Sequence, residues 1–174
     1  MNWDQKISET QEYAGSADEM IMVFSAYPGA SGEMINRLKN KYPFADEEYL
    51  DFLKTSNGIV IETIVLYGLN DNQYNSMHDA EDLWGFVRGV GQDGIPIGHF
   101  PSGDCLILCI DGKVRIINYT MTDILEGDII AESFSTFLND FLMGSRFLEL
   151  WLPHIWKEAD ETLWTQFLRL KGWL

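Results

Sequence analysis

The chain has 174 residues, of which 46% are hydrophobic and 22% charged. This length and composition suit one globular domain that buries its own core, and they exclude an intrinsically disordered chain. Lys and Arg number 12 against 27 Asp and Glu, so the formal net charge is −15. Because nucleic acids and anionic membranes are bound largely through Lys and Arg, we expect neither as a partner.

The N-terminus, the apolar runs and the cysteines predict the compartment. The first six residues, MNWDQK, show no basic region followed by the apolar stretch of a signal peptide. No apolar run approaches the ~18 residues of a membrane-spanning helix. Cys105 and Cys109 are four positions apart in a strand-like run, which places their Cα atoms roughly 13 Å apart and too far apart for a disulfide. We therefore expect two buried thiols and a cytoplasmic protein.

Two helices are predicted in the first third of the chain, whereas the segment before about Tyr27 gives no clear pattern. Ser31 is placed to cap a helix that runs to about Tyr42, because apolar residues recur along it at spacings of three and four. Asp46 is placed to cap a second helix, with two glutamates in its first turn. The dipeptide Asn57-Gly58 is expected to end that helix.

The middle of the chain is predicted to contain strands and one short helix. The β-branched, apolar run Ile59–Tyr67 indicates one strand that is buried on at least one face. Residues 68–75 are rich in Asn and Asp and are expected to form a loop. A short helix is predicted at residues 79–87, and a short strand at residues 95–98.

A hairpin and an amphipathic helix are the clearest local signals. Asp111-Gly112 separates the apolar runs 105–110 and 113–119, which predicts a two-residue hairpin turn. Ser133 is placed to cap a helix that ends at Gly144, with an apolar stripe at Phe134, Phe137, Leu138, Phe141 and Leu142. We assign this stripe to the core and not to a cofactor site.

The residues after Gly144 are rich in tryptophan. Two more helices are predicted there, around Pro153 and around residues 157–160, and the segment holds four of the six tryptophans, Trp151, Trp156, Trp164 and Trp173. These rings either pack onto the domain or form part of a contact surface. The order of helices, hairpin-linked strands and helices argues for an α+β fold.

Several short segments resemble catalytic or ligand-binding motifs of other proteins, but each lacks a feature that such a site requires. Residues 89–94 match G-x-G-x-x-G, but a strand-like segment follows where a dinucleotide site needs a helix. Residues 70–72 (NDN) begin like a calcium loop that lacks its glycine and its final glutamate. His99, Ser102 and Asp104 share one short loop, which rarely aims three side chains as a catalytic triad. The histidines show no metal-ligand spacing, so we predict no enzyme, no metal and no cofactor.

Three stretches together resemble the SMI1/KNR4 family, also called the SUKH superfamily. They are residues 49–58 (YLDFLKTSNG), residues 95–98 (IPIG) with 102–108 (SGDCLIL), and residues 130–138 (IAESFSTFL). The resemblance covers about residues 30–145. It departs from the family at residues 42–49, where the usual L-P-x-x-Y is looser, and it does not reach the tryptophan-rich tail.

The resemblance implies an α+β domain with a central, largely antiparallel sheet and flanking helices. We expect a single domain over residues 1–174, with an SMI1/KNR4-like core at 30–145 and a helical, Trp-rich C-terminal extension at 146–174. In bacteria the family is best known for immunity proteins that neutralise polymorphic toxins, many of them nucleases. In fungi it includes regulators linked to cell-wall synthesis. It implies no catalytic residue and no cofactor.

The acidic charge suggests how a partner would be recognised. A nuclease that grips phosphates is basic, so an acidic inhibitor is steered to it. We predict a contact patch at Asp71, Asp79, Glu81 and Asp82; the alternative is a solvated face of a protein that is acidic for solubility. A regulatory or scaffold protein with no toxin partner is the alternative function, and a small enzyme is a third. The oligomeric state is left open.

Overall fold

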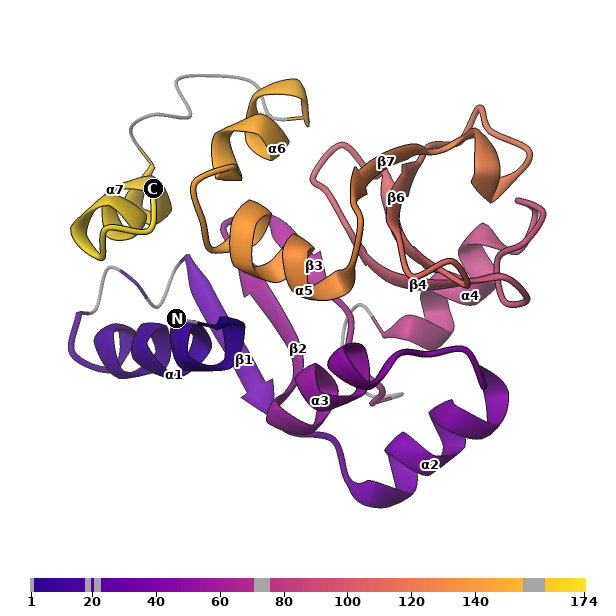
Figure 1. Cartoon of the computed structure of the whole chain (residues 1–174), viewed down its shortest axis with the longest axis horizontal. Helices are drawn as coiled ribbons and strands as arrows, with labels where there is room; N and C mark the ends of the chain where they lie inside the picture. Colours follow the sequence, from indigo (N-terminus) through magenta and orange to yellow (C-terminus); the bar gives the residue numbers. More distant parts are fainter. Residues whose placement is uncertain (1, 18–19, 21–22, 71–75, 155–161) are drawn as a thin grey trace.

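The computed structural model describes residues 2–17, 20, 23–70, 76–154 and 162–174, with no side-chain detail for residues 151–154. A sheet of seven strands holds the described chain together, and every strand is antiparallel to its neighbours in chain order, from β1 to β7. The expected α+β fold with an antiparallel sheet is confirmed (Figure 1). The strands are β1 Phe24–Pro28, β2 Ser56–Ile61, β3 Ile64–Leu66, β4 Gly94–His99, β5 Cys105–Cys109, β6 Val114–Ile117 and β7 Asp128–Ala131.

Helices surround this sheet, and the two ends of the chain lie on the same side of the molecule (Figure 1). Among the described residues, no helix combines the length and apolar character that a bilayer crossing requires. The helices are α1 Trp3–Ala14, α2 Gly32–Lys41, α3 Glu47–Thr55, α4 Met77–Trp84, α5 Phe134–Thr136, α6 Phe147–His154, α7 Leu163–Leu170, the 3-10 helix η2 Ile124–Glu126 and the π-helix η3 Phe137–Leu142.

Two apolar cores lie on opposite faces of the sheet, and strand β5 contributes to both. Its residues Leu106 and Leu108 belong to the larger core, while Cys105, Ile107 and Cys109 belong to a smaller one. Alternate residues of a strand point to opposite faces, so a strand covered on both sides is apolar throughout. This explains the uninterrupted run CLILC. Both cysteines are buried and free, as expected.

The predicted helix starts are confirmed, but the predicted end of α3 is wrong. The Ser31 hydroxyl accepts a hydrogen bond from the Met34 amide (3.3 Å), and the Asp46 carboxylate accepts one from the Tyr49 amide (2.7 Å). Helix α3 ends at Thr55 and continues directly into β2, so Asn57 and Gly58 lie in a strand. The Asn57 side chain instead accepts a hydrogen bond from the Leu69 amide (2.7 Å).

The run Ile59–Tyr67 is not the single strand that its composition predicts. It forms the end of β2, a turn at Glu62 and Thr63, and the short strand β3. Glu62 adopts a φ of 56°, which is the left-handed conformation that tight turns require. The Glu62 carboxylate accepts a hydrogen bond from the Trp164 amide (3.1 Å). The turn therefore contacts a residue more than 100 positions later, which local sequence cannot reveal.

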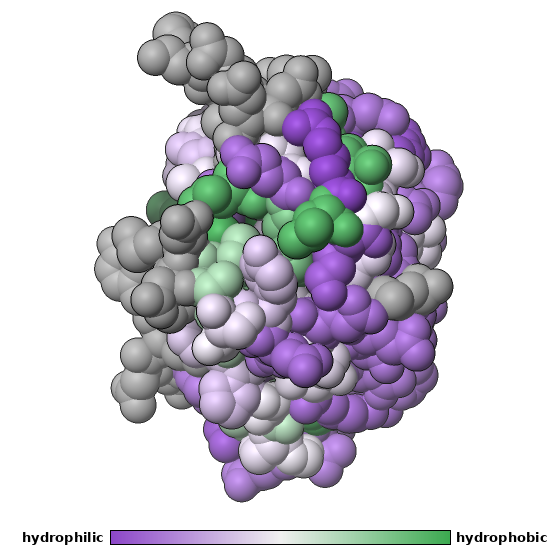
Figure 2. All heavy atoms as spheres, turned by 90° about the vertical axis from the view of Figure 1, so that its left-hand side faces the viewer, coloured by the Kyte–Doolittle hydropathy of each residue, from purple (hydrophilic) through white to green (hydrophobic). Residues whose placement is uncertain are grey.

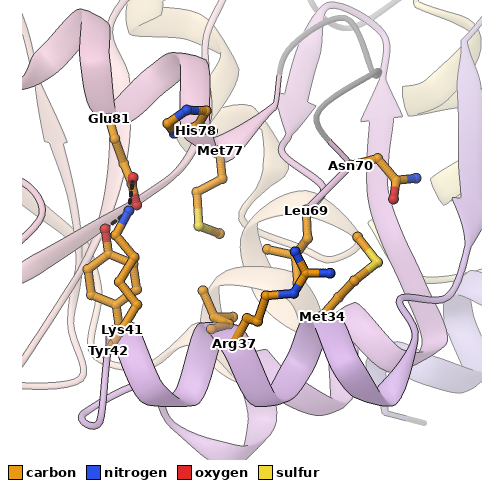
Figure 3. A pocket seen from close by; sticks show the side chains of 10 residues that line it. Met34, Arg37, Lys41, Tyr42, Leu69, Asn70, Met77, His78 and Glu81 are labelled. Atoms are coloured by element: carbon orange, nitrogen blue, oxygen red, sulfur yellow. Dashed lines mark hydrogen bonds and ion pairs between the residues drawn. The ribbon is translucent and has the colours of Figure 1, made fainter.

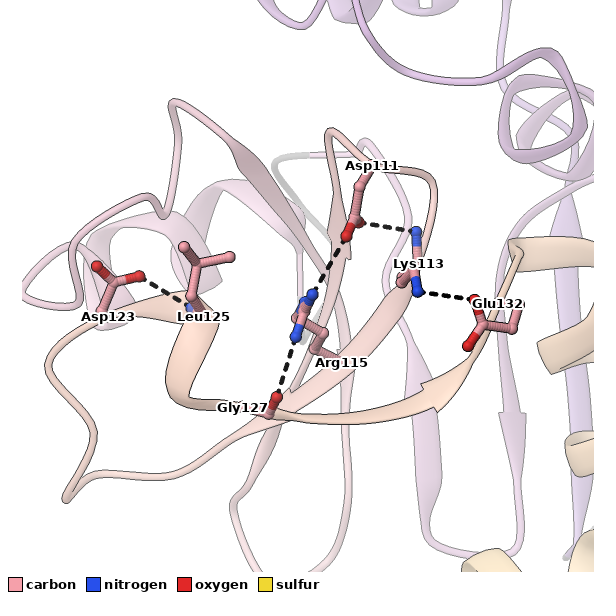
Figure 4. A network of polar contacts seen from close by, with 7 residues as sticks. All are labelled: Asp111, Lys113, Arg115, Asp123, Leu125, Gly127 and Glu132. Carbon is pink, nitrogen blue, oxygen red and sulfur yellow. Dashed lines mark hydrogen bonds and ion pairs between the residues drawn. The ribbon is translucent and has the colours of Figure 1, made fainter.

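The β5–β6 hairpin is confirmed, but its turn is longer than two residues. Residues 110–113 separate the strands, and Gly112 has a positive φ of 80° while Asp111 does not. Figure 4 shows how charged side chains join this hairpin to the residues on either side of the edge strand β7. Arg115 pairs with Asp111 (3.1 Å) and donates to the Gly127 carbonyl (3.3 Å), and Lys113 pairs with Glu132 (2.8 Å).

The apolar stripe that begins after Ser133 is buried as predicted, but most of the segment is a π-helix. Ser133 accepts a hydrogen bond from the Thr136 amide (3.1 Å), and the α-helical hydrogen bonding then gives way to η3. A lysine from the N-terminal helix satisfies carbonyl groups at the end of η3. Lys6 Nζ donates to the carbonyls of Asn139 (2.8 Å) and Met143 (2.6 Å). Burial lowers the pKa of the Lys6 ammonium, and the nearby Asp140 carboxylate opposes this shift.

Replacing Lys6 with methionine is expected to lower the free energy of unfolding by about 1–3 kcal/mol, because one buried and one partly buried carbonyl lose their donor. Urea titration of both proteins measures the change. The matched control is Lys54→Met, since the Lys54 ammonium is exposed and pairs with Asp51 on the surface; we expect a change within about 0.5 kcal/mol there. Equal effects at the two positions would show that the Lys6 bonds contribute nothing specific.

Candidate functional site

Helix α4 is the element on which the candidate site is built, and its residues divide into three groups. The Ser76 hydroxyl begins the helix by accepting a hydrogen bond from the Asp79 amide (3.2 Å). The buried side chains are those of Met77, Ala80 and Trp84, at spacings of three and four, and they anchor the helix on the sheet. The remaining side chains line a pocket or point to solvent.

The outward face of α4 carries both charge and apolar surface. Asp79, Asp82, Leu83 and Phe86 follow one another at spacings of three, one and three, which places them on one helical stripe. All four are exposed, and Leu83 and Phe86 keep 56% and 57% of their surface open to solvent. Phe86 lies just beyond the helix end, after Gly85 in a helical backbone conformation. Large side chains so exposed are common at contact surfaces.

The predicted contact residues that the structure describes differ in their exposure to solvent. Asp79 and Asp82 are exposed on the outward stripe of α4, whereas Asp71 lies outside the described residues. Glu81 is different, because its side chain is only 11% exposed and it pairs with the Lys41 ammonium and the Tyr42 hydroxyl. Burial and the bond to Glu81 raise the pKa of the Tyr42 hydroxyl, which therefore remains a donor. Glu81 acts inside the fold, and its charge is already balanced.

Glu81 lines a pocket of about 620 Å³ between α2 and α4 (Figure 3). Its apolar wall is formed by Met34, Leu38, Leu69 and Met77, and its polar residues are Arg37, Lys41, Tyr42, Asn70, His78 and Glu81. Arg37 also pairs with Glu33 on the surface of α2 (3.1 Å). Positive and negative groups thus neutralise one another around the pocket, in contrast to the outward stripe of α4.

Next to that stripe, three aromatic rings form a nearly parallel stack. Trp84 is buried, and its ring lies 4.4 Å from that of Tyr119 and 5.9 Å from that of Phe86, measured between centroids. The planes of Phe86 and Tyr119 differ by 10°, and Tyr119 is 55% exposed. We call Trp84, Phe86 and Tyr119 the aromatic platform, and we call the platform together with Asp79, Asp82 and Leu83 the α4 surface.

Comparison with protein families agrees with this architecture. The model of the SMI1 / KNR4 family (SUKH-1) matches residues 29–140, which is more than half of the chain. The chain belongs to the SMI1/KNR4 family. A search of curated proteins finds no match. The matched region runs from the residue after β1 to within η3, so it includes α4 and the whole aromatic platform of this SMI1/KNR4 protein.

The apolar part of the α4 surface was not predicted from the sequence of this family member. The signal was present, because Leu83 and Phe86 are out of phase with the buried residues Met77, Ala80 and Trp84. A helix with apolar residues on two faces is covered on both or exposes one of them. The place of Tyr119 in this surface could not have been predicted, because its contact with Trp84 joins residues that are 35 positions apart in the sequence.

The motifs with possible chemistry remain separate in the SMI1/KNR4 fold. Gly89 and Gly91 take positive φ values of 95° and 79° in a loop that leads into β4, so no helix follows the glycine motif. His99 Nδ1 faces the Tyr67 hydroxyl (2.9 Å), while Ser102 donates to Asp104 (2.8 Å). Within the described residues, no three His, Cys, Asp or Glu side chains are grouped to hold a metal ion. Asp71 and Asn72 of the calcium-like segment lie outside those residues.

Burial lowers the pKa of the His99 imidazole in the folded protein. In the unfolded chain, the pKa of a histidine is about 6.5. As the pH falls, the imidazole therefore takes up a proton first in the unfolded state. The free energy of unfolding decreases once the pH drops below the pKa of the unfolded chain. When the pH is lowered from about 7.5 to 5.5, we expect the free energy of unfolding to fall more in the native protein than in His99→Gln. The difference should grow by at most ~1.4 kcal/mol per pH unit. Urea titrations at several pH values measure this difference. A constant difference would contradict the assignment.

The tail of this SMI1/KNR4 protein forms a second apolar region, where α7 lies beside α1. A hollow of about 260 Å³ between the helices is lined by Tyr13, Ala17, Met20, Leu163, Gln166, Phe167 and Leu170. Figure 2 shows apolar side chains gathered on this face among hydrophilic ones. Leu170 is 67% exposed.

Proposed function

We propose that this SMI1/KNR4 protein is an immunity protein, a non-enzymatic module that binds and neutralises a basic toxin domain, often a nuclease. The observation that carries the proposal is the α4 surface, where exposed carboxylates adjoin exposed aromatic rings within the region matched by the family. The expected partner is a protein, and the expected place of action is the bacterial cytoplasm.

Charge supports this choice of partner. The chain has a net charge of −15, and complementary charge accelerates the encounter with a basic protein. Asp79 and Asp82 add local negative charge on a rigid helix, while the carboxylate of Glu81 is held by Lys41. A nuclease presents cations where it binds phosphates. An acidic inhibitor that covers those cations would exclude the nucleic acid.

The test begins with capture of the partner by the tagged, full-length chain at low salt. Lysates of the source cells and of neighbouring strains are used, because such toxins also arrive from other cells. Proteins released by stepped salt are identified by mass spectrometry, then expressed in a bacterial host with and without this chain. We expect one basic protein that stops growth alone and is harmless when co-expressed.

The alternative family function predicts a different result. A regulator or scaffold linked to cell-wall synthesis would retain several unrelated partners, and none would be a toxin rescued by co-expression. A purified nuclease assay adds a direct readout, because the captured toxin should lose activity at equimolar immunity protein. A toxin that binds the chain but keeps its activity in that assay would contradict neutralisation.

A further inference from the structure

The aromatic platform is anchored by one buried ring, and its other two rings are exposed. Trp84 is 1% exposed and belongs to the smaller core with Cys105, Ile107 and Ile117. Tyr119 lies on this fixed ring at 4.4 Å, and Phe86 borders both. Preorganised aromatic side chains lose little entropy on binding, which is why such rings dominate the energetics of many interfaces.

The charges around the platform are predominantly negative. Asp79 and Asp82 lie on the same stripe as Phe86, and the loop that holds Tyr119 continues to Asp123 and Glu126. Arg88 Nε donates to Asp123 (2.6 Å), so these two charges balance one another, and the free negative charge comes from the other carboxylates. Exposed ring faces combined with carboxylates favour a cation, since the π-electrons and the carboxylates both attract positive charge.

We propose that the aromatic platform binds an arginine side chain of the partner protein, whose guanidinium stacks on Phe86 and Tyr119 while Asp82, one helical turn before Phe86, supplies the opposite charge. Arginine fits better than lysine because its planar guanidinium stacks on rings and is weakly hydrated. A second copy of this chain is a poor occupant, because its own acidic α4 surface would be brought against this one. The inference rests on the proposed function only for the identity of the partner.

The first test uses hexaarginine and hexalysine as probes, because they carry equal charge and need no toxin. Calorimetric titration at low salt compares the native chain with Phe86→Ala, Tyr119→Ala and the double variant. These substitutions leave the net charge unchanged, so general attraction to an acidic protein is preserved. We expect the double variant to weaken hexaarginine binding about tenfold, and hexalysine binding less than twofold.

Two controls test whether the loss of affinity comes from the aromatic platform. Leu170→Ala removes an exposed apolar side chain on α7, away from the platform, and should change neither affinity. Circular dichroism and thermal melting verify the fold, and Phe86→Ala alone serves if Tyr119→Ala loosens the loop. Unchanged hexaarginine affinity in the variants, or equal losses for both peptides, would overturn the inference. A native dimer that the variants convert to a monomer would assign the platform to a second copy instead.

The same variants are then tested against the captured toxin, where they should weaken binding at least tenfold. This separates the two proposals. If the native chain neutralises the toxin and the platform variants bind it equally well, only the arginine site is wrong. If the peptide results hold but no captured protein is a neutralised toxin, the immunity function is wrong and the arginine site stands for another partner.

Discussion

Replacing Trp164 with alanine is expected to lower the free energy of unfolding by about 3–5 kcal/mol. Trp164 is fully buried, its ring stacks 5.9 Å from that of Phe24, and its indole N–H donates to the Leu142 carbonyl (3.0 Å). The substitution removes this packing and leaves a buried carbonyl without its donor. Thermal melting should show a decrease in Tm of about 6–20 °C.

Leu170→Ala is the matched control, because Leu170 lies on the same helix and is 67% exposed. It should change the free energy of unfolding by no more than about 0.5 kcal/mol. If Trp164→Ala is equally mild, α7 is an independent appendage and not part of the main core. That outcome would also restore the tail as the better candidate for a contact surface.

Because the tail packs into the larger core, its role in binding cannot be tested by deleting it. Deleting every residue after Gly144 would remove Phe147, Leu150, Trp164 and Phe167, which are all buried in the larger core. We expect such a truncated chain to be unfolded or aggregated, so loss of binding would not identify the tail as a contact surface. Of the four tryptophans of the tail, Trp164 is buried and Trp173 packs partly against the core. The side chains of Trp151 and Trp156 are not described.

Local rules predicted the parts of the fold that depend on local interactions. Ser31 and Asp46 cap helices because each cap needs a side-chain oxygen and an amide three residues later. The stripe that begins at Phe134 is buried because helical periodicity alone brings its residues to one face. The family resemblance, whose three stretches all lie within the family match, supplied the sheet that joins these pieces.

The errors have a common physical cause, which is that distant partners override local preference. Helix α3 runs into β2 without a glycine stop, and the Asn57 side chain bonds instead to the amide of Leu69, which lies beyond β3. The π-helix keeps its unusual hydrogen bonding where Lys6 from the first helix satisfies its carbonyls. Of the predicted contact patch, Glu81 is held by the last lysine of α2 and the tyrosine that follows it, which no local pattern could assign to it.

Reversing the charges of Asp79 and Asp82 is expected to slow association with the captured toxin at least tenfold at low salt. The change from two aspartates to two lysines repels a basic partner at the surface where it docks, and steering of this kind varies association rates over several decades. Stopped-flow or surface-binding kinetics at increasing salt measures the effect. The difference from the native chain should shrink as salt screens the charges.

Glu81 is left unchanged in this experiment, because its reversal would break the pairing with Lys41 and Tyr42 and disturb the fold. The control is the double reversal Glu12→Lys and Glu48→Lys, which alters net charge equally at exposed positions on α1 and α3. If both double variants slow association to the same extent, net charge alone controls the encounter. If the α4 variant is slower by tenfold, the partner approaches this helix, and the acidic stripe has a role beyond solubility.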